Sequence, residues 1–189
     1  MIKIGILGDI GSGKSYVSKN FGYPVFNADH EVAKLYQQNK NIFFKLKKKL
    51  PKYIFSFPIN KDEIIRAILA NKSNLKKIIK IVHLEIKKKI NIFIKKNANK
   101  KIIILDIPLL LENKINNKKD VLVFVESKKS DVLKRLKKRT NFNKQLLNRF
   151  QNIQLPLEYK KRKSHYIIKN NFTKKKIKRA VKDILVEII

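Results

Sequence analysis

The sequence predicts an α/β fold, in which a parallel sheet is covered by helices on both faces and is interrupted by a helical insertion. Short apolar runs of β-branched residues alternate with helical patterns near both ends of the chain, as in strand–helix–strand units. A long middle stretch has helical apolar spacing only. The 189 residues contain neither an internal repeat nor a Gly/Ser/Pro-rich linker, so we expect one domain.

The chain opens with a strand, a helix and a second short strand. The apolar run at residues 2–7 predicts a buried strand, residues 14–21 predict a helix, and residues 25–26 predict the second strand. From residue 28 to residue 94 the apolar spacing is mostly helical. Two prolines interrupt this stretch, and we expect the segment between them, residues 53–57, to be a loop or a short extended piece.

The second half returns to strands. Residues 102–106 form the clearest buried strand of the sequence, because they are apolar and β-branched, and residues 121–125 form another. Ser130 is expected to cap a helix at residues 131–139.

The last elements are a polar helical stretch from Lys144, a short strand at residues 165–168 and a terminal helix. Thr173 is expected to cap that helix. Its inner stripe consists of apolar residues at helical spacing: Ile177, Val181, Ile184, Leu185 and Ile188.

The strongest chemical signal is residues 8–15, GDIGSGKS, which match G-x-x-x-x-G-K-[ST] between the first strand and the first helix. Small residues at 11–13 let backbone N–H groups surround a phosphate, and the helix N-terminus adds partial positive charge. Lys14 would reach the β- and γ-phosphate oxygens, and Ser15 would offer a hydroxyl to Mg²⁺. The alternative is a Gly-rich turn followed by a chance lysine. The eight-residue match and its setting favour nucleotide binding by a P-loop NTPase-like fold.

Two carboxylates follow predicted strands, where a parallel sheet binds its ligands. Asp29 comes just after the second strand, and it would either accept or orient the proton of a substrate hydroxyl or cap a helix from Glu31 onward. Asp106 closes the strongest strand, where it would either lie near Mg²⁺ or merely end the strand. Position alone leaves both pairs of alternatives open.

A basic cluster lies in the helix expected at residues 131–139. It would either clamp the charge of a transferring phosphoryl group or form a solvated helix face. The second alternative is favoured for the lysines. Arginine is scarce in this chain, so the two arginines are harder to explain in that way. The cluster consists of Lys134, Arg135, Lys137, Lys138 and Arg139.

The formal net charge is +32, which taken alone suggests nucleic-acid binding. The basic residues are 40 Lys and only 6 Arg, and they accompany 29 Ile and 19 Asn. These abundant residues have AT-rich codons, whereas arginine, the preferred reader of bases and phosphates, is depleted. Lysine is also spread along the whole chain. Nucleotide bias is therefore the favoured interpretation, and a positive surface would still help to capture anionic substrates.

Composition excludes several classes of protein. The absence of cysteine excludes disulfides, a thiolate nucleophile and a thiolate metal site. No uncharged apolar run approaches the roughly 18 residues that a membrane span needs, and the first residues already resemble folded core and not a signal peptide. We therefore expect a cytoplasmic protein without membrane partners.

The sequence resembles the dephospho-coenzyme A kinase family over nearly its whole length. Residues 8–16 match the family's Gly-Gly-Ile-Gly-Ser-Gly-Lys-Ser-Thr, and residues 106–112 match Asp-Ile-Pro-Leu-Leu-x-Glu. These two segments together are specific. Residues 24–29 are similar to the family's Pro-Val-Ile-Asp-Ala-Asp segment, and His83-Leu84 is similar to its His-Pro pair. Arg139, Arg149 and Gln154 resemble the family's lid pattern, and residues 164–170 resemble Ala-Asp-x-x-Ile-x-Asn.

The resemblance implies ATP-dependent phosphorylation of the ribose 3′-hydroxyl of dephospho-coenzyme A, with ATP and Mg²⁺ as cofactors. It implies an α/β core at about residues 1–30, 101–130 and 164–189, a helical substrate-binding region at about 31–100 and a lid at about 131–160. The site residues that it implies are Asp29 as base and Lys14 in catalysis; Gly11, Ser12, Gly13, Lys14, Ser15, Tyr16 and Arg139 for ATP; Asp29, His83, Pro108 and Leu109 for the acceptor; and Ser15 and Asp106 for Mg²⁺.

The chain departs from the family pattern at several positions that matter for activity. Asn27 replaces the first aspartate of Asp-Ala-Asp, and Asp9 brings a negative side chain beside the phosphate loop. Tyr16 replaces threonine, Leu7 stands where threonine is common, and Leu84 replaces the proline of the His-Pro pair. None of these changes removes Lys14, Ser15, Asp29 or Asp106, but together they predict reduced activity.

Two other functions remain open at this point. One is another nucleoside or nucleotide kinase of the same fold, and the other, less favoured, is a basic nucleic-acid-binding protein. For the favoured kinase we expect ATP and dephospho-coenzyme A as partners, no specific nucleic acid, and a monomer or weak homo-oligomer.

Overall fold

The computed structural model describes residues 1–140 and 142–189. The described chain divides into two compact units. The sheet unit comprises residues 1–27, 94–142 and 154–189, and the helical unit comprises residues 28–93 and 143–153.

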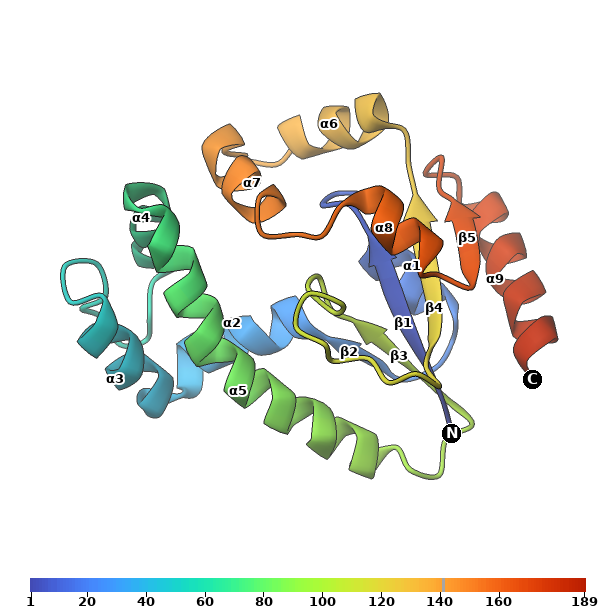
Figure 1. Ribbon diagram of the computed structural model, residues 1–189, viewed down its shortest axis with the longest axis horizontal. Helices are drawn as coiled ribbons and strands as arrows, with labels where there is room; N and C mark the ends of the chain where they lie inside the picture. Colours follow the sequence, from blue (N-terminus) through green and yellow to red (C-terminus); the bar gives the residue numbers. More distant parts are fainter. Residues whose placement is uncertain (141) are drawn as a thin grey trace. The chain divides into compact units, whose positions relative to one another are not determined.

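The sheet unit is built on five parallel strands (Figure 1). They are β1 (Ile2–Gly8), β2 (Val25–Asn27), β3 (Ile102–Asp106), β4 (Val121–Glu126) and β5 (Tyr166–Lys169), in the order β2-β3-β1-β4-β5. The central strand β1 pairs with β3 and β4, so its carboxyl end lies between theirs. The predicted parallel sheet is confirmed, with strand ends within a residue or two of those expected.

One face of the sheet is covered by α1 (Lys14–Asn20) and α9 (Lys174–Ile188). Ile4 and Ile6 of β1 point into the core on this face, which also contains Ile177, Val181 and Ile184 from the predicted stripe of α9. Leu185 and Ile188, the other members of that stripe, are partly buried against the same core.

The opposite face is covered by the segment after β3 and by α8 (Leu157–Arg162), which packs against β1. Gly5 of β1 lies beneath this layer, and a Cβ atom there would come 2.5 Å from Leu110 Cδ2. A larger residue at position 5 would push the layer away from the sheet. The sequence did not predict α8 as a separate helix.

Two helix caps in the structure differ from those that the sequence predicts. Helix α6 (Lys129–Lys137) begins before Ser130, and Lys128 stands at the N-cap position without a side-chain cap bond. The prediction that Ser130 caps this helix is therefore wrong. Thr173 does occupy the N-cap of α9 but makes no cap bond, because its hydroxyl donates to Asn171 Oδ1 over 2.7 Å.

The helical unit contains α2 (Ala28–Gln38), α3 (Lys40–Lys49), α4 (Lys61–Ala70), most of α5 (Lys72–Lys96) and α7 (Lys144–Gln151). Asparagine side chains cap three of these helices: Asn39 accepts from Ile42 N, Asn60 from Asp62 N and Asn143 from Leu146 N. The side-chain oxygens of these short residues accept hydrogen bonds from backbone N–H groups of the first turn, which have no partner within the helix. The helical middle predicted from apolar spacing is confirmed.

The loop between α3 and α4 is held by a buried carboxylate. Glu63, only 1% exposed, accepts hydrogen bonds from Phe55 N, Ser56 N and the Ser56 hydroxyl. Three donors compensate the cost of burying this acid. Residues 53–57 thus form a loop, which is one of the two forms that the sequence predicts for them.

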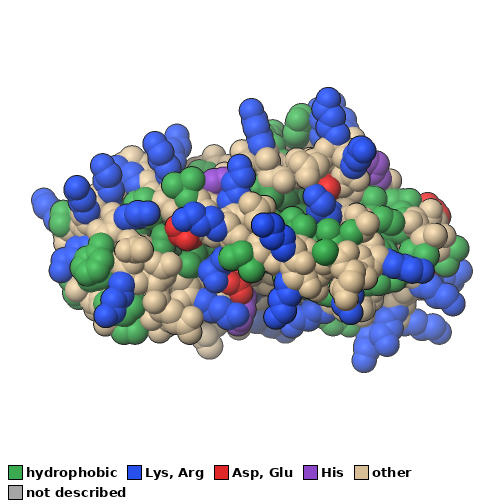
Figure 2. All heavy atoms as spheres, turned by 90° about the horizontal axis from the view of Figure 1, so that it is seen from below, with side chains coloured by type: hydrophobic (Ala, Val, Ile, Leu, Met, Phe, Trp, Pro, Cys, Tyr) green, Lys and Arg blue, Asp and Glu red, His purple; other side chains and the backbone are tan. Residues whose placement is uncertain are grey.

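Basic side chains are spread over the face shown in Figure 2, among hydrophobic and neutral residues. They do not gather into one patch there, which agrees with lysine being distributed along the whole sequence. Within residues 1–140 and 142–189, none of the helices is long and apolar enough to cross a membrane.

Candidate active site

The phosphate-binding motif forms a loop between β1 and α1, as expected. Gly11 and Gly13 have φ angles of 85° and 91°, in the left-handed region that favours glycine. Space also demands glycine at position 13, because a Cβ there would come 2.4 Å from Asn170 Nδ2. The loop thus adopts the tight, side-chain-free path that exposes backbone N–H groups at a helix N-terminus.

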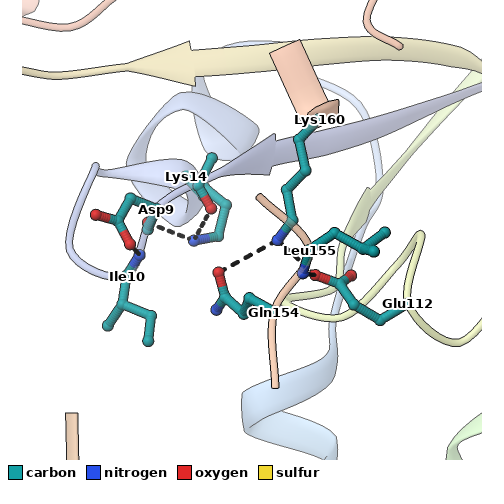
Figure 3. Close-up of polar contacts among 8 residues, drawn as sticks. Asp9, Ile10, Lys14, Glu112, Gln154, Leu155 and Lys160 are labelled. Carbon is teal, nitrogen blue, oxygen red and sulfur yellow. Dashed lines mark hydrogen bonds and ion pairs between the residues drawn. The ribbon is translucent and has the colours of Figure 1, made fainter. Parts of the chain in front are cut away.

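Lys14 folds back over this loop (Figure 3). Its ammonium group donates to Gly8 O over 3.2 Å and to Asp9 O over 2.8 Å. The cation is therefore already held above the loop in which a phosphate would sit, and only its side chain has to turn to reach a phosphate oxygen.

Asp9, the acidic departure from the family pattern, is bound locally. Its Oδ1 accepts a hydrogen bond from Ile10 N over 2.7 Å (Figure 3). This bond stabilises the start of the loop, but it also keeps a carboxylate next to a site intended for anions.

The far side of the loop is held by Asn170, which is only 3% exposed. Asn170 Nδ2 donates to Ser12 O over 2.7 Å, and the Ser127 hydroxyl donates to the same carbonyl over 3.0 Å. Sequence reasoning included Asn170 in a family motif but assigned it no role. Its role here is to tie the end of β5 to the phosphate loop.

Asp106 ends β3 beside Asn27, the last residue of β2. The Asp106 carboxylate is 3% exposed, and its Oδ2 accepts from Asn27 Nδ2 over 2.7 Å. The amide is therefore a direct partner of the carboxylate expected near Mg²⁺. Sequence reasoning treated Asn27 only as a lost carboxylate, because the partner lies 79 positions away in the chain.

Asp29 is exposed in the first turn of α2, in the helical unit. The helix begins at Ala28, so Asp29 is inside it and does not cap it. Two residues later, Glu31 forms ion pairs with Lys89 of α5 over 2.9 Å and with Lys34 over 3.1 Å. The hydrogen bond from Lys89, followed by that from Lys34, holds the pKa of Glu31 below its ordinary value.

The other expected site residues lie on several elements. Ser15 and Tyr16 are exposed in the first turn of α1, and Arg139 is exposed two residues beyond the end of α6. His83 is half-buried on α5 in the helical unit, and Pro108 and Leu109 are half-buried after β3 in the sheet unit. Within the sheet unit, the fold brings the phosphate loop and Asp106 to the carboxyl edge of adjacent strands.

A buried ion pair lies under β1 (Figure 3). Lys160 of α8 is 1% exposed; its ammonium lies 2.6 Å from Glu112 Oε1 and donates to Gln154 Oε1 over 3.2 Å. Leu155 N also donates to Glu112 Oε1. Sequence reasoning missed Lys160, because nothing distinguishes one lysine among 40.

The oxygen donors present suit Mg²⁺. The hydroxyl of Ser15 and the carboxylate of Asp106 are hard ligands, and Mg²⁺ commonly takes only one or two protein oxygens beside phosphate oxygens and water. No cluster of three or more His, Cys, Asp or Glu side chains that could hold a metal occurs in the described part of the chain.

Comparison with protein families gives a match over residues 2–176, to the model described as dephospho-CoA kinase. A curated dephospho-CoA kinase from Wolbachia sp. subsp. Brugia malayi is 34% identical over 187 residues, covering 96% of this chain and 95% of that protein. A dephospho-CoA kinase of Thermus thermophilus is 25% identical over 190 residues, covering 99% of this chain and 92% of the other.

Solved structures show the same fold. The structure titled TT1252 from Thermus thermophilus superposes with a TM-score of 0.76 at 25% identity, covering 100% of this chain and 98% of that one. A shikimate kinase from Acinetobacter baumannii superposes with a TM-score of 0.54 at 14% identity, covering 100% and 93%. The P-loop kinase architecture expected from the sequence is therefore confirmed.

Proposed function

The chain belongs to the dephospho-CoA kinase family, and on this premise we propose that it transfers the γ-phosphoryl group of ATP to the ribose 3′-hydroxyl of dephospho-coenzyme A, completing coenzyme A. The observation that carries the proposal is the phosphate loop with Lys14 held above it, in a chain that matches the family from residue 2 to residue 176. The transfer needs positioning and charge stabilisation more than covalent chemistry, and this loop provides both.

The phosphate loop binds the donor. Gly11, Ser12, Gly13 and Ser15 of the loop bind the phosphates in this proposal, chiefly through backbone N–H groups, and Tyr16 extends the first turn of α1 at their edge. Lys14 exchanges its two carbonyl partners for phosphate oxygens, so it brings positive charge to the group that is transferred. Arg139 approaches from the segment after α6 and adds a second cation.

Asp29 acts as the base. Its carboxylate is exposed in the first turn of α2, and it accepts the proton of the substrate hydroxyl as the oxygen attacks phosphorus. The family resemblance further supports His83, Pro108 and Leu109 as contacts of the acceptor. The segment around residues 131–160 serves as the lid.

Ser15 and Asp106 would hold Mg²⁺, which supplies charge neutralisation between the β- and γ-phosphates when it is bound. We place this activity in the cytoplasm, with ATP and dephospho-coenzyme A as partners, no specific nucleic acid, and a monomer or weak homo-oligomer as the working form.

The test is turnover with Mg-ATP and dephospho-coenzyme A, followed by mass spectrometry for ADP and coenzyme A. D29N should lower kcat about 10²- to 10⁴-fold. D62N is a matched control, because Asp62 is also exposed in the first turn of a helix, α4, and it should leave kcat unchanged. Absence of turnover, or equal turnover with nucleoside monophosphates, would contradict the proposal, and the second result would favour another nucleotide kinase.

A further inference from the structure

The buried pair of Lys160 and Glu112 is not explained by stability alone. The two side chains are 1% and 10% exposed, and among the described residues no group donates to the second carboxylate oxygen, Glu112 Oε2, which is buried. Burying two charges is expensive, and an ion pair with an unpartnered oxygen recovers that cost incompletely. Well-packed apolar residues would serve the stability of the sheet unit as well or better.

The pair fixes Gln154 through two hydrogen bonds. Glu112 Oε1 accepts from Leu155 N over 2.9 Å, which holds the backbone immediately after Gln154. Lys160 Nζ donates to Gln154 Oε1 over 3.2 Å, which holds the carboxamide itself. The two charged residues therefore set both the position of Gln154 and the direction of its side chain.

The direction of the Gln154 carboxamide follows from the chemistry of its partner. An ammonium group has three donors and no acceptor, so the carboxamide must turn its oxygen toward Lys160. The nitrogen, with two N–H donors, is thereby turned away from Lys160 (Figure 3). Within residues 1–140 and 142–189, no protein group accepts from this nitrogen, and Gln154 is only half-buried.

Gln154 lies at the edge of the sheet where ligands are expected. Helix α8 packs against β1 and leads into the parallel strand β5. His165, between α8 and β5, donates from its backbone N–H to Leu122 O near the beginning of β4. The end of α8 is therefore at the amino edge of the sheet, and its start is toward the carboxyl edge, which carries the phosphate loop. Figure 3 shows the Gln154 side chain extending toward Lys14.

We propose that Gln154 is a catalytic residue, whose Nε2 donates a hydrogen bond to a nonbridging oxygen of the phosphoryl group during transfer. Lys160 and Glu112 are positioning residues, which act through Gln154. The inference rests on the proposed function, because it needs a phosphoryl donor bound at the phosphate loop. Gln154 neither gains nor loses a proton in this role.

The role requires a donor that is already oriented before the substrate binds. In phosphoryl transfer the negative charge is spread over the oxygens of the transferred group, and fixed donors stabilise that charge without having to reorganise. A carboxamide that is held by a buried cation meets this requirement. The expense of burying Lys160 and Glu112 is thus explained by the preorganisation of Gln154 and not by stability.

Two substitutions of Gln154 share only the loss of its N–H donors. Q154E keeps an oxygen that accepts from Lys160, so it should preserve thermal stability, whereas Q154M introduces no charge. Both should lower kcat with dephospho-coenzyme A about 10²- to 10³-fold, the usual effect of removing one fixed donor. Q154M should leave both KM values nearly unchanged, because the contact strengthens only in the transition state. Steady-state kinetics and thermal denaturation measure these effects.

The positioning role is tested with the double variant K160M/E112L. It should be close to the unmodified chain in stability but should lower kcat about 10- to 100-fold, because the carboxamide is then free to turn. Combined with Q154M, it should lower kcat no further than Q154M alone, since residues that act through one group are not additive. A further loss of the same size in the triple variant would contradict the positioning role.

A second measurement needs no acceptor. Calorimetric titration with Mg-ADP and aluminium fluoride, which mimics the phosphoryl group in transfer, should show binding weakened about 10²- to 10³-fold in Q154M. Binding of Mg-ADP alone should not change. Q37E is the control for both measurements, because Gln37 is an exposed glutamine of α2 and receives the same change of charge as in Q154E.

The two proposals fail in different ways. If the unmodified chain phosphorylates dephospho-coenzyme A and both Gln154 variants keep its kcat, the role of Gln154 is overturned and the proposed function stands. If the unmodified chain does not phosphorylate dephospho-coenzyme A, the proposed function fails, and the titration decides the role of Gln154 by itself. Equal affinity of Q154M and the unmodified chain for Mg-ADP with aluminium fluoride would overturn that role.

Discussion

At the residue scale, the carboxylate at the end of β3 depends on its neighbour. Asp106 is almost fully buried, and an amide donor from Asn27 lies 2.7 Å away. A buried carboxylate needs hydrogen-bond donors to offset its loss of hydration. Asparagine at position 27 therefore compensates for the burial of Asp106.

Restoring the acid should reveal this dependence. N27D places two carboxylates within hydrogen-bond distance of each other, so like-charge repulsion replaces the hydrogen bond to Asp106. Without Mg²⁺ we expect the free energy of unfolding to fall by about 1–3 kcal/mol, the cost of a lost buried hydrogen bond. Excess Mg²⁺ should recover part of the loss. Urea denaturation with and without Mg²⁺ measures both effects.

The exposed Asn41 provides the control for that experiment. N41D should change stability little, and Mg²⁺ should not alter the result. If N27D is as stable as the unmodified chain without Mg²⁺, the hydrogen bond to Asp106 has no energetic role.

The buried pair of Lys160 and Glu112 gives a larger expected effect. K160M would leave the Glu112 carboxylate buried without its cation, which typically costs about 3–5 kcal/mol. Removing both charges, in K160M with E112L, should recover much of the loss, since burying two ions is itself expensive. Thermal and urea denaturation of the single and double variants measure the coupling.

The next residue in the chain supplies a matched control. Lys161 forms a similarly short pair, 2.6 Å from Glu126, but both side chains are about one third exposed. K161M should destabilise the chain far less than K160M, as for other surface pairs. Equal effects of K160M and K161M would show that burial of the first pair has no special importance.

These residues show where sequence reasoning on the site succeeds and where it ends. The loop that carries Gly13 and Lys14 could be predicted because its motif is contiguous. The roles of these two residues in binding stay predictions. Lys160 and Glu112 come from segments 48 positions apart, and no local pattern distinguishes a lysine that will be buried from one that will be solvated. Only the packing of α8 against β1 decides that Lys160 is buried.

At the element scale, strands were easier to predict than helix starts. The strand Ile102–Asp106 is fully buried, and its β-branched composition alone indicated it. Helix α6 begins at Lys129 without a side-chain cap bond, so the serine at 130 misled the prediction. Helix α8 has only six residues, too few for apolar periodicity to be recognised.

Helix α2 offers a prediction at this scale, because Glu31 connects it to α5 through Lys89. The ion pairs lower the pKa of Glu31 in the folded chain. The stability that they contribute is therefore present above the unfolded pKa and is lost as the pH falls through the folded value. E31Q should reduce the free energy of unfolding of the helical unit by about 0.5–1 kcal/mol near neutral pH.

That difference between E31Q and the unmodified chain should shrink as the pH drops below the ordinary glutamate pKa of 4.5. Hydrogen exchange of α2 and α5 amides across this range measures it locally. E85Q is a useful comparison, because Glu85 pairs only with the exposed Lys88 of its own helix. A constant difference at all pH values would mean that E31Q acts through packing and not through charge.

At the scale of the whole molecule, the net charge of +32 must be reconciled with a kinase of the dephospho-CoA family. The charge comes mainly from 40 lysines distributed along the chain, whereas arginine, the preferred reader of nucleic acid, occurs only 6 times. ATP and dephospho-coenzyme A are anions, so a diffuse positive field attracts both without defining a binding site. Its effect should therefore be on association and not on the chemical step.

The salt dependence of the kinetics distinguishes an effect of the charge on association from an effect on the chemical step. Raising NaCl shortens the screening length from about 10 Å at 0.1 M to about 3 Å at 1 M, so kcat/KM for both substrates should fall by about tenfold or more over that range. The value of kcat should stay nearly constant, because the proposed contacts of Lys14 and the phosphate loop with bound substrate are short-range and are screened little. Binding to duplex DNA in a gel-shift titration should disappear over the same range, as expected for nonspecific attraction to phosphates. Site-selective DNA binding that survives physiological salt would instead show that the charge has a second, selected use.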